Sequence, residues 1–120
     1  MEADVTRIAA RYFAAWHEKD FPTLRSLLSE QFEYRGPLAR LDNPDACRES
    51  LERLAPITTA VAVNGVFVAG DEVTTWFDLH TTVAEPTPVA NRMRVAAGKI
   101  TAIHAVYDPR ELLGETESKK

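Results

Sequence analysis

The 120-residue sequence has few of the residues that could cross-link a small domain through disulfides or metal ions. It contains one cysteine, Cys47, and three scattered histidines, so it can form no internal disulfide and no set of ligands stands at metal-site spacing. Hydrophobic residues make up 45% of the chain, which is enough for an ordinary core. We therefore expect one compact domain with no structural metal ion and no cofactor.

Positive charge is also scarce. The 14 lysines and arginines against 18 acidic residues give a net charge of -4, which disfavours a nucleic-acid backbone or an anionic membrane as partner. No stretch approaches the roughly 20 apolar residues that span a bilayer, and residues 1–4 lack the basic start of a secretory signal. The sequence thus predicts a cytoplasmic protein whose partners include neither nucleic acid nor membrane.

The N-terminal segment carries the strongest periodic signal. An apolar stripe predicts a helix from about Asp4 to Lys19, and its members are Val5, Ile8, Ala9, Tyr12, Phe13 and Trp16. Tyr12 and Trp16 are four residues apart, so they share one face, and each brings a hydrogen-bond donor that needs a partner when buried. A pocket would supply that partner, and so would a carbonyl group in an ordinary core; both interpretations stay open.

The next segment predicts a short helix and a short strand. Asp20 has the position of an N-cap, and the helix that it begins should end near Ser29. Apolar and charged residues alternate over residues 32–35, which predicts a strand with Phe32 and Tyr34 facing inward. A Gly-Pro pair then ends the strand.

A third helix and a sheet complete the domain. Asn43 and Pro44 have the positions of an N-cap and a first helical residue, and Pro56 ends the helix. From Ile57 onward, β-branched and aromatic residues between turn signals predict four strands joined as a meander, near residues 58–68, 72–83, 88–96 and 99–107. Strands of this length indicate a strongly curved sheet.

The predicted fold class is α+β, with three N-terminal helices covering one face of the curved sheet. No repeat or linker interrupts the chain, so residues 1–109 should form a single domain. Residues 110–120 form a polar tail that we expect to fray, above all from Gly114 to Lys120.

This order of elements resembles the NTF2-like superfamily, and the local sequence resembles its SnoaL-like, polyketide cyclase-like members. The likeness lies in the first helix (residues 11–16), the first strand (32–37) and the final hairpin (91–100), within a match over residues 4–109. It implies a cone-shaped fold with a mixed or antiparallel sheet and a pocket between the long helix and the sheet. Because this fold hosts isomerases, hydrolases, cyclases, dehydratases and plain binding or assembly modules, it does not fix the activity.

A distant resemblance to ketosteroid isomerase implies roles for three positions. Tyr12 and Asn91 fall on that enzyme's oxyanion-binding tyrosine and protonated aspartic acid, which implies that they donate hydrogen bonds to an oxyanion or ligand oxygen. The general base falls on Gly36, which has no side chain. In SnoaL-like cyclases the position of Asn91 resembles that of the catalytic acid, and an amide cannot release a proton. Both proton carriers are thus replaced, and whether the chain is an enzyme stays open.

The same resemblance turns alternate strand residues toward the pocket. The implied ligand-binding residues are Trp16, Tyr34, Thr75, Phe77, Met93, Ile103 and Tyr107. None of them is expected to bind a metal ion. Such a lining would bind a mostly hydrophobic carbonyl compound that is polyketide- or steroid-like. The resemblance also implies an enzyme of the isomerase, cyclase or dehydratase type. The alternative is a non-catalytic ligand-binding module or a dimeric assembly module.

The opposite sheet face carries a second set of candidates. Trp76, Asp78 and His80 alternate with the pocket residues. The last strand adds His104, together with Ile100, Ala102 and Val106. A carboxylate and an imidazole two residues apart would suit acid-base chemistry, but strand parity places them outside the pocket. Because an exposed tryptophan on a sheet is unfavourable unless another surface covers it, we expect a homodimer through this face.

The other polar candidates have simpler explanations. Cys47 lies among apolar residues of the third helix and suits a small core position. His17 lies at the end of the first helix, where its charge favours the helix C-terminus. Asp45 lies at a helix start, where capping explains an acidic residue, and Glu33 and Arg35 should be solvated.

Overall fold

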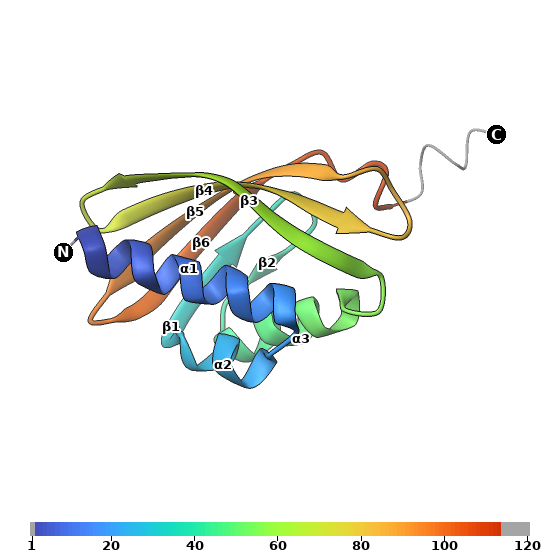
Figure 1. Ribbon diagram of the computed structural model, residues 1–120. Helices are drawn as coiled ribbons and strands as arrows, with labels where there is room; N and C mark the ends of the chain where they lie inside the picture. The colour runs from blue at the N-terminus through green and yellow to red at the C-terminus, as the bar shows by residue number, and fades with distance from the viewer. Residues whose placement is uncertain (1, 114–120) are drawn as a thin grey trace.

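The computed structural model describes residues 2–113 as an α+β fold (Figure 1). In chain order its elements are α1 (Glu2–Glu18), α2 (Phe21–Ser26), β1 (Leu28–Arg35), β2 (Arg40–Leu41), α3 (Pro44–Leu54), β3 (Thr58–Ala69), β4 (Glu72–Thr81), β5 (Thr87–Ala96) and β6 (Lys99–Val106). The predicted fold class is confirmed, and the predicted bounds of α1, α3 and the last four strands agree closely with the observed ones.

Capping side chains begin the two shorter helices as predicted. The Asp20 carboxylate accepts a hydrogen bond from the N–H of Thr23 at 3.3 Å, at the start of α2. The Asn43 side-chain oxygen accepts one from the N–H of Ala46 at 2.8 Å, at the start of α3, whose first residue is Pro44. Each side chain thereby satisfies an amide donor that the first turn of a helix leaves free.

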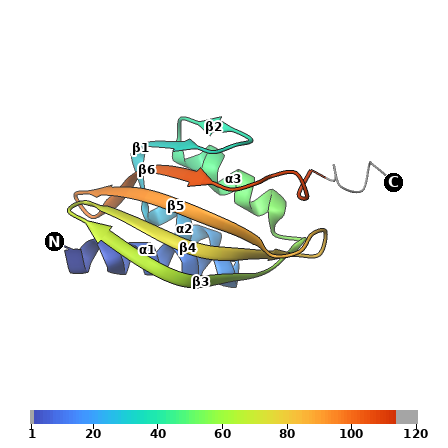
Figure 2. The same ribbon diagram turned by 90° about the horizontal axis from the view of Figure 1, so that it is seen from above.

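All six strands form one mixed sheet in the order β2-β1-β6-β5-β4-β3 (Figure 2). β1 pairs in parallel with β6, whereas the other neighbouring strands pair antiparallel. Among the described residues the helices lie on one side of the sheet, with α1 against β3 and β4 and α3 against β1 (Figure 1). We call the helix-covered face the inner face and the opposite one the outer face.

Side-chain burial alternates strictly along β4 and β5. The buried inner-face residues of these strands are Val73, Thr75, Phe77, Leu79, Thr87, Val89, Asn91, Met93 and Val95. Trp76, between two of them, is exposed on the outer face. The inward and outward parity that the sequence predicts for both strands is confirmed.

α2 is shorter and β1 is longer than the sequence predicts. α2 ends at Ser26 rather than Ser29, and β1 already begins at Leu28. Leu28 pairs with Ile100 of β6, and the N–H of Ile100 donates to the carbonyl oxygen of Leu27 at 2.9 Å. Pairing with a strand far along the chain therefore outweighs the helical spacing of the local leucines.

The segment between β1 and α3 contains the short strand β2, which was not predicted from the sequence. Its Leu41 pairs with Tyr34 of β1, and the N–H of Gly36 donates to the carbonyl oxygen of Ala39 at 2.9 Å. These bonds fold the segment back along β1. Tyr34 consequently lies between β2 on one side and β6 on the other.

Ile100 is fully buried, contrary to its predicted place on the outer face. Arg94 pairs with Ala102, but the next residue, Val95, pairs with Ile100, which leaves Thr101 as an extra residue in β6. Such a β-bulge reverses the alternation of side chains along one strand and bends it. The prediction for Ile100 was wrong because the sequence pattern contains no sign of this extra residue.

Part of the predicted C-terminal tail has a defined place. The N–H of Leu113 donates to the carbonyl oxygen of Pro109 at 3.0 Å. The guanidinium of Arg110 donates to the carboxylate of Asp108 at 2.6 Å. The predicted fraying of Gly114 to Lys120 lies outside the described residues.

Candidate functional site

A cavity of about 380 Å³ lies between the helices and the inner face of the sheet. Its lining comes from α1, α3 and every strand except β3, and from the segments that follow β1 and β6. Leucine, alanine, valine and aromatic side chains make up most of this lining. A space of this size and polarity is typical of sites for small molecules.

Three aromatic side chains form one wall of the cavity. The rings of Tyr12 and Trp16, on the same face of α1, are 6.3 Å apart and meet edge to face. The Trp16 ring meets the ring of Phe77 on β4 in the same way at 5.5 Å. All three side chains are buried. Edge-to-face contacts are favourable, so they stabilise the packing of α1 on β4.

The hydroxyl of Tyr12 donates a hydrogen bond to the sulfur of Cys47 on α3. Burial raises the pKa of Tyr12 well above its ordinary value, and the neighbouring Cys47 raises it further. Burial also raises the pKa of the Cys47 thiol to about 11, against the opposing effect of the Tyr12 hydrogen bond. Both groups are therefore neutral near pH 7, and a neutral thiol is a poor nucleophile.

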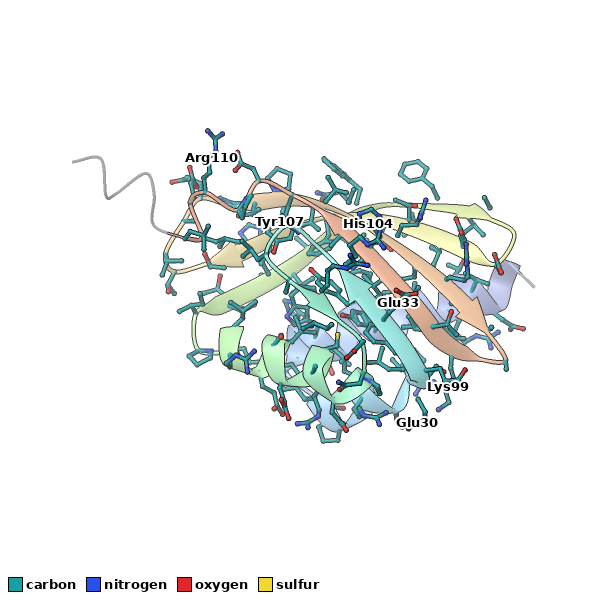
Figure 3. All side chains as sticks on the ribbon, turned by 180° about the vertical axis from the view of Figure 1, so that it is seen from behind. Glu30, Glu33, Lys99, His104, Tyr107 and Arg110 are labelled. Atoms are coloured by element: carbon teal, nitrogen blue, oxygen red, sulfur yellow. The ribbon has the colours of Figure 1, made fainter. Side chains whose placement is uncertain are left out.

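The hydroxyls of Tyr34 and Tyr107 form a second hydrogen-bonded pair. Tyr107 lies just after β6, near the C-terminal segment that carries Arg110 (Figure 3). Burial raises the pKa of both phenols, and the proximity of Tyr107 raises that of Tyr34 further. This pair is also neutral near pH 7.

Three buried side-chain atoms of the described residues have no hydrogen-bond partner: Nε1 of Trp16, Oγ1 of Thr75 and Oδ1 of Asn91. Trp16 and Asn91 line the cavity. Thr75 is the cross-strand neighbour of Asn91 but lines a different groove, between α1 and β3. Because buried polar groups are nearly always hydrogen-bonded, the indole N–H and the amide oxygen indicate a place for polar atoms of another molecule.

The cavity contains no side chain that readily exchanges a proton near pH 7. In the described part of the chain, none of its lining residues is an aspartate, a glutamate or a histidine, and Arg53 is the one charged residue. Arg53 is exposed, and its guanidinium donates to the hydroxyl of Ser50 at 3.3 Å. Such a lining can position and bind a molecule, but it offers no general base at neutral pH.

The structure brings six of the nine predicted site residues to the cavity, namely Tyr12, Trp16, Tyr34, Phe77, Asn91 and Tyr107. Thr75, Met93 and Ile103 lie on the inner face but not at the cavity, and Met93 and Ile103 are packed in the core with 0% and 2% exposure.

Sequence reasoning placed no residue of α3, of β2, of the segment between β1 and β2 or of the segment beyond Tyr107 at the cavity, and Cys47, Leu112 and Leu113 are among the lining residues that it missed. Cys47 is buried, as predicted for a core position, but it also faces the cavity. Its helical spacing with Leu51 and Leu54, which both line the cavity, is the signal that points to it. The two leucines carry no such signal because they lie beyond the predicted end of the domain.

His17 has a structural role that its position on α1 does not reveal. Its Nδ1 atom accepts a hydrogen bond from the backbone N–H of Val61 on β3 at 3.1 Å. A ring nitrogen that accepts a hydrogen bond carries no proton. His17 thus connects the end of α1 to the edge strand of the sheet.

Asp45 takes part in an ion-pair cluster in addition to its predicted place in the first turn of α3. Nε of Arg25 on α2 donates to its carboxylate at 2.7 Å, and the same guanidinium lies 3.0 Å from Glu30 on β1. The hydrogen bond from Arg25 lowers the pKa of Asp45. The ion-pair cluster joins α2, β1 and α3 outside the cavity. It gives the carboxylate of Asp45 a structural role that requires no catalytic one.

Large apolar side chains are exposed on the outer face. Trp76 is 45% exposed, Phe67 66% and Val106 60%. Trp76 and Val106 flank Ala90 in one row across β4, β5 and β6. An apolar row of this kind on an uncovered sheet is typical of a contact surface.

The polar residues predicted for the outer face do not line the cavity. The carboxylate of Asp78 accepts a hydrogen bond from the side-chain amide of Asn64 at 3.1 Å. His104 of β6 and Glu33 of β1 lie on neighbouring strands of the same face (Figure 3). His80, like Asp78 and His104, is not among the residues that line the cavity.

Residues 2–113 contain no group of three or more histidine, cysteine, aspartate or glutamate side chains placed to hold a metal ion. Within the same residues, none of the helices has the length and apolar character needed to cross a membrane.

The SnoaL-like domain family matches residues 9–103. The chain belongs to this family. Among curated proteins, none matches the sequence of this SnoaL-like chain.

Solved structures with similar folds carry several descriptions. An NTF2-like protein of unknown function from Cytophaga hutchinsonii has a TM-score of 0.83 at 20% identity, over 91% of this chain and 94% of that one. An LEH-like epoxide hydrolase from M. tuberculosis has a TM-score of 0.78 at 18% identity, over 98% of each chain. A hypothetical protein from Catenulispora acidiphila, with a ketosteroid isomerase-like fold and bound trimethylamine, has a TM-score of 0.75 at 20% identity, over 92% of each. At these identities the likeness establishes the NTF2-like fold alone.

Proposed function

We propose that this SnoaL-like protein binds a small, mostly hydrophobic carbonyl compound, polyketide- or steroid-like, in its cavity without transferring a proton. The observation that carries the proposal is the buried Nε1–H of Trp16, which has no partner in an otherwise apolar wall. An indole N–H only donates, so it calls for an acceptor such as a carbonyl oxygen. The surrounding hydrocarbon and aromatic side chains would contact the apolar body of the ligand.

Tyr12 and Asn91 complete the proposed polar contacts. The amide nitrogen of Asn91 is a second potential donor on the cavity wall. The Tyr12 hydroxyl bonds to Cys47, whose sulfur is a weak acceptor. A carbonyl oxygen is a stronger acceptor than a thiol, so a bound ligand would compete for the Tyr12 hydroxyl.

A binding protein fits the cavity better than an isomerase, a cyclase or a dehydratase. Each of those reactions moves a proton, and a carrier must reach the reacting atom. Gly36 and Asn91 stand where related enzymes keep such carriers, and the tyrosines and Cys47 at the cavity hold their protons near pH 7. We therefore favour the non-catalytic hypothesis.

We also propose that a second copy of the chain covers the outer face. Trp76, Phe67 and Val106 are the exposed apolar residues that such a contact would bury. Gly65 and Ala90, the cross-strand neighbours of Trp76, have no side chain that would hold a partner sheet away. Burial of this apolar row would supply the driving force for association.

Titration with 2-acetonaphthone, an apolar aryl ketone, tests the binding proposal. We expect the ketone to raise the melting temperature of the unmutated protein, because it binds the folded state alone. Ala105→Leu, which places a larger side chain in the cavity wall, should abolish this rise. Ala102→Leu, on the same strand but facing outward, is the matched control and should preserve it. If aryl and alkyl ketones of graded size all leave the melting temperature of the unmutated protein unchanged, the proposal is wrong.

A further inference from the structure

Oδ1 of Asn91 points to a second feature of the ligand. We infer that the cavity selects carbonyl compounds that also carry a neutral hydroxyl group, whose proton is donated to Oδ1 of Asn91 while an oxygen of the ligand accepts from Nε1 of Trp16. This inference rests on the proposed function, because it specifies the ligand of the same cavity.

The protein itself supplies no donor to the Asn91 oxygen. Asn91 is 4% exposed and lies on β5 between Thr75 of β4 and Ala105 of β6. Alanine has no polar side chain, and the Thr75 hydroxyl is unpartnered as well, so the two neighbouring oxygens are not hydrogen-bonded to each other. The amide oxygen therefore belongs to a residue that lines the cavity and is buried without the hydrogen bond that such a group normally has.

The three phenols at the cavity are already hydrogen-bonded. The Tyr12 hydroxyl bonds to Cys47, and the hydroxyls of Tyr34 and Tyr107 bond to each other. A ligand with acceptors only, such as a simple ketone or ether, would satisfy Trp16 but leave the Asn91 oxygen unpaired and cut off from water. A buried polar group without a partner disfavours a ligand that lacks the matching group.

The charge of the cavity distinguishes a hydroxyl from other donors. A protonated amine would also donate to Asn91, but the described lining contains no carboxylate to balance its charge. Burial of an unpaired charge in an apolar cavity is strongly unfavourable. The chemical class that fits both atoms is thus an alcohol, a phenol or an enol.

Three naphthalenes of similar shape test this selection: 2-naphthol, which donates and accepts, 2-methoxynaphthalene, which only accepts, and 2-acetonaphthone, the ketone probe used above. Dissociation constants are measured by calorimetry. We expect 2-naphthol to bind the unmutated protein roughly two- to tenfold more tightly than 2-methoxynaphthalene, the range that one buried hydrogen bond supplies.

The variants assign the preference to its two atoms. Asn91→Leu should remove the preference for the naphthol over the ether, whereas Trp16→Phe should weaken both probes and leave their ratio unchanged. Thr75→Val, which removes the neighbouring unpartnered hydroxyl outside the cavity, is the control and should change neither constant. Without ligand, Asn91→Leu should melt no lower than the unmutated protein, because it removes an unsatisfied buried group.

Two results would overturn the inference. The first is an Asn91→Leu variant that keeps the preference for 2-naphthol. The second is a melting temperature well below that of the unmutated protein for both Asn91→Leu and Thr75→Val, which would mean that Asn91 and Thr75 are hydrogen-bonded to each other. In either case, binding of 2-acetonaphthone would leave the proposed function intact. Failure of all three probes to bind would instead refute the proposed function itself.

Discussion

The phenol of Tyr34 occupies the space where a side chain of residue 36 would begin. A Cβ atom built on Gly36 would lie 2.9 Å from Cζ of Tyr34 and closer still to its hydroxyl oxygen. Contacts this short require one of the two residues to move. The resemblance to ketosteroid isomerase implies that its general base falls on this position, where Gly36 offers no base and where any larger side chain would require Tyr34 to move.

We predict that the protein does not isomerise ketosteroids. Conversion of a β,γ-unsaturated ketosteroid, followed by the absorbance of the conjugated product, should proceed near the uncatalysed rate. A positioned base contributes on the order of 10² to 10⁴ in rate, so its absence should be plain. Turnover far above the background rate in the unmutated protein would show that another residue acts as the base.

The crowding around position 36 has its own test. Gly36→Asp should lower the melting temperature because its side chain collides with Tyr34. Adding Tyr34→Ala makes room and should recover part of the loss. If Gly36→Asp alone is as stable as the unmutated protein, the two residues are not in the arrangement described.

Sequence patterns predicted those parts of the fold that local chemistry determines. The inward parity that the family resemblance implied for Thr75, Phe77 and Leu79 of β4 is correct, and every second residue from Val73 to Leu79 is buried. The start of α3 was predictable from Asn43, since a capping side chain acts on the first turn that follows it. Tyr12 and Trp16 could be assigned to one face from their spacing alone.

Features that depend on distant parts of the chain were not predictable. The pairing of Leu28 with Ile100 brings a β-strand to residues that locally resemble a helix. The bulge at Thr101 moved Ile100 into the core without any mark in the sequence. The bond between Tyr12 and Cys47 joins two helices, and only their packing determines that the two groups meet.

Alkaline pH should destabilise the fold through Cys47. Its pKa is about 11 in the folded protein, against an ordinary value of 9.0. An acid whose pKa is raised by folding stabilises the protein below the unfolded-state pKa, and this contribution is lost as pH rises through the folded-state pKa. The free energy of unfolding should therefore fall between about pH 9 and pH 11, by an amount on the order of 2 to 3 kcal/mol for two pKa units.

Urea titrations at several pH values measure this loss. Cys47→Ala removes the thiol and should show a shallower decline, with the remainder due to the raised pKa of Tyr12. In the native protein the thiol should also react slowly with iodoacetamide until the pH approaches 11. Rapid alkylation at pH 8 without unfolding would contradict the buried, neutral state of Cys47.

His17 should stabilise the protein by accepting the hydrogen bond of the Val61 N–H. His17→Leu leaves this partly buried donor without a partner and should lower the free energy of unfolding by roughly 1 to 3 kcal/mol. His17→Asn, whose side-chain oxygen is a possible acceptor at a similar distance from the backbone, should lose less. Equal stability of the leucine variant and the unmutated protein in urea would contradict this role.

Trp76 should be essential for the proposed dimer. Trp76→Glu places a charge in the apolar row of the outer face and should shift the protein to the monomer at micromolar concentration. Asp78→Asn, two residues away on the same face, tests whether charge near the row matters as much as the tryptophan. Light scattering that gives a monomer for the unmutated protein would rule the dimer out.

The indole N–H groups report on ligand binding most directly, because the chain contains two tryptophans, one at the cavity and one on the outer face. A ¹H–¹⁵N correlation spectrum resolves both, and Trp16→Phe assigns them. On titration with 2-acetonaphthone, our account predicts that the Nε1–H signal of Trp16 moves downfield as it gains an acceptor, while that of Trp76 stays in place. A Trp16 signal that does not move at a saturating ketone concentration, or a change confined to Trp76, would contradict binding in this cavity.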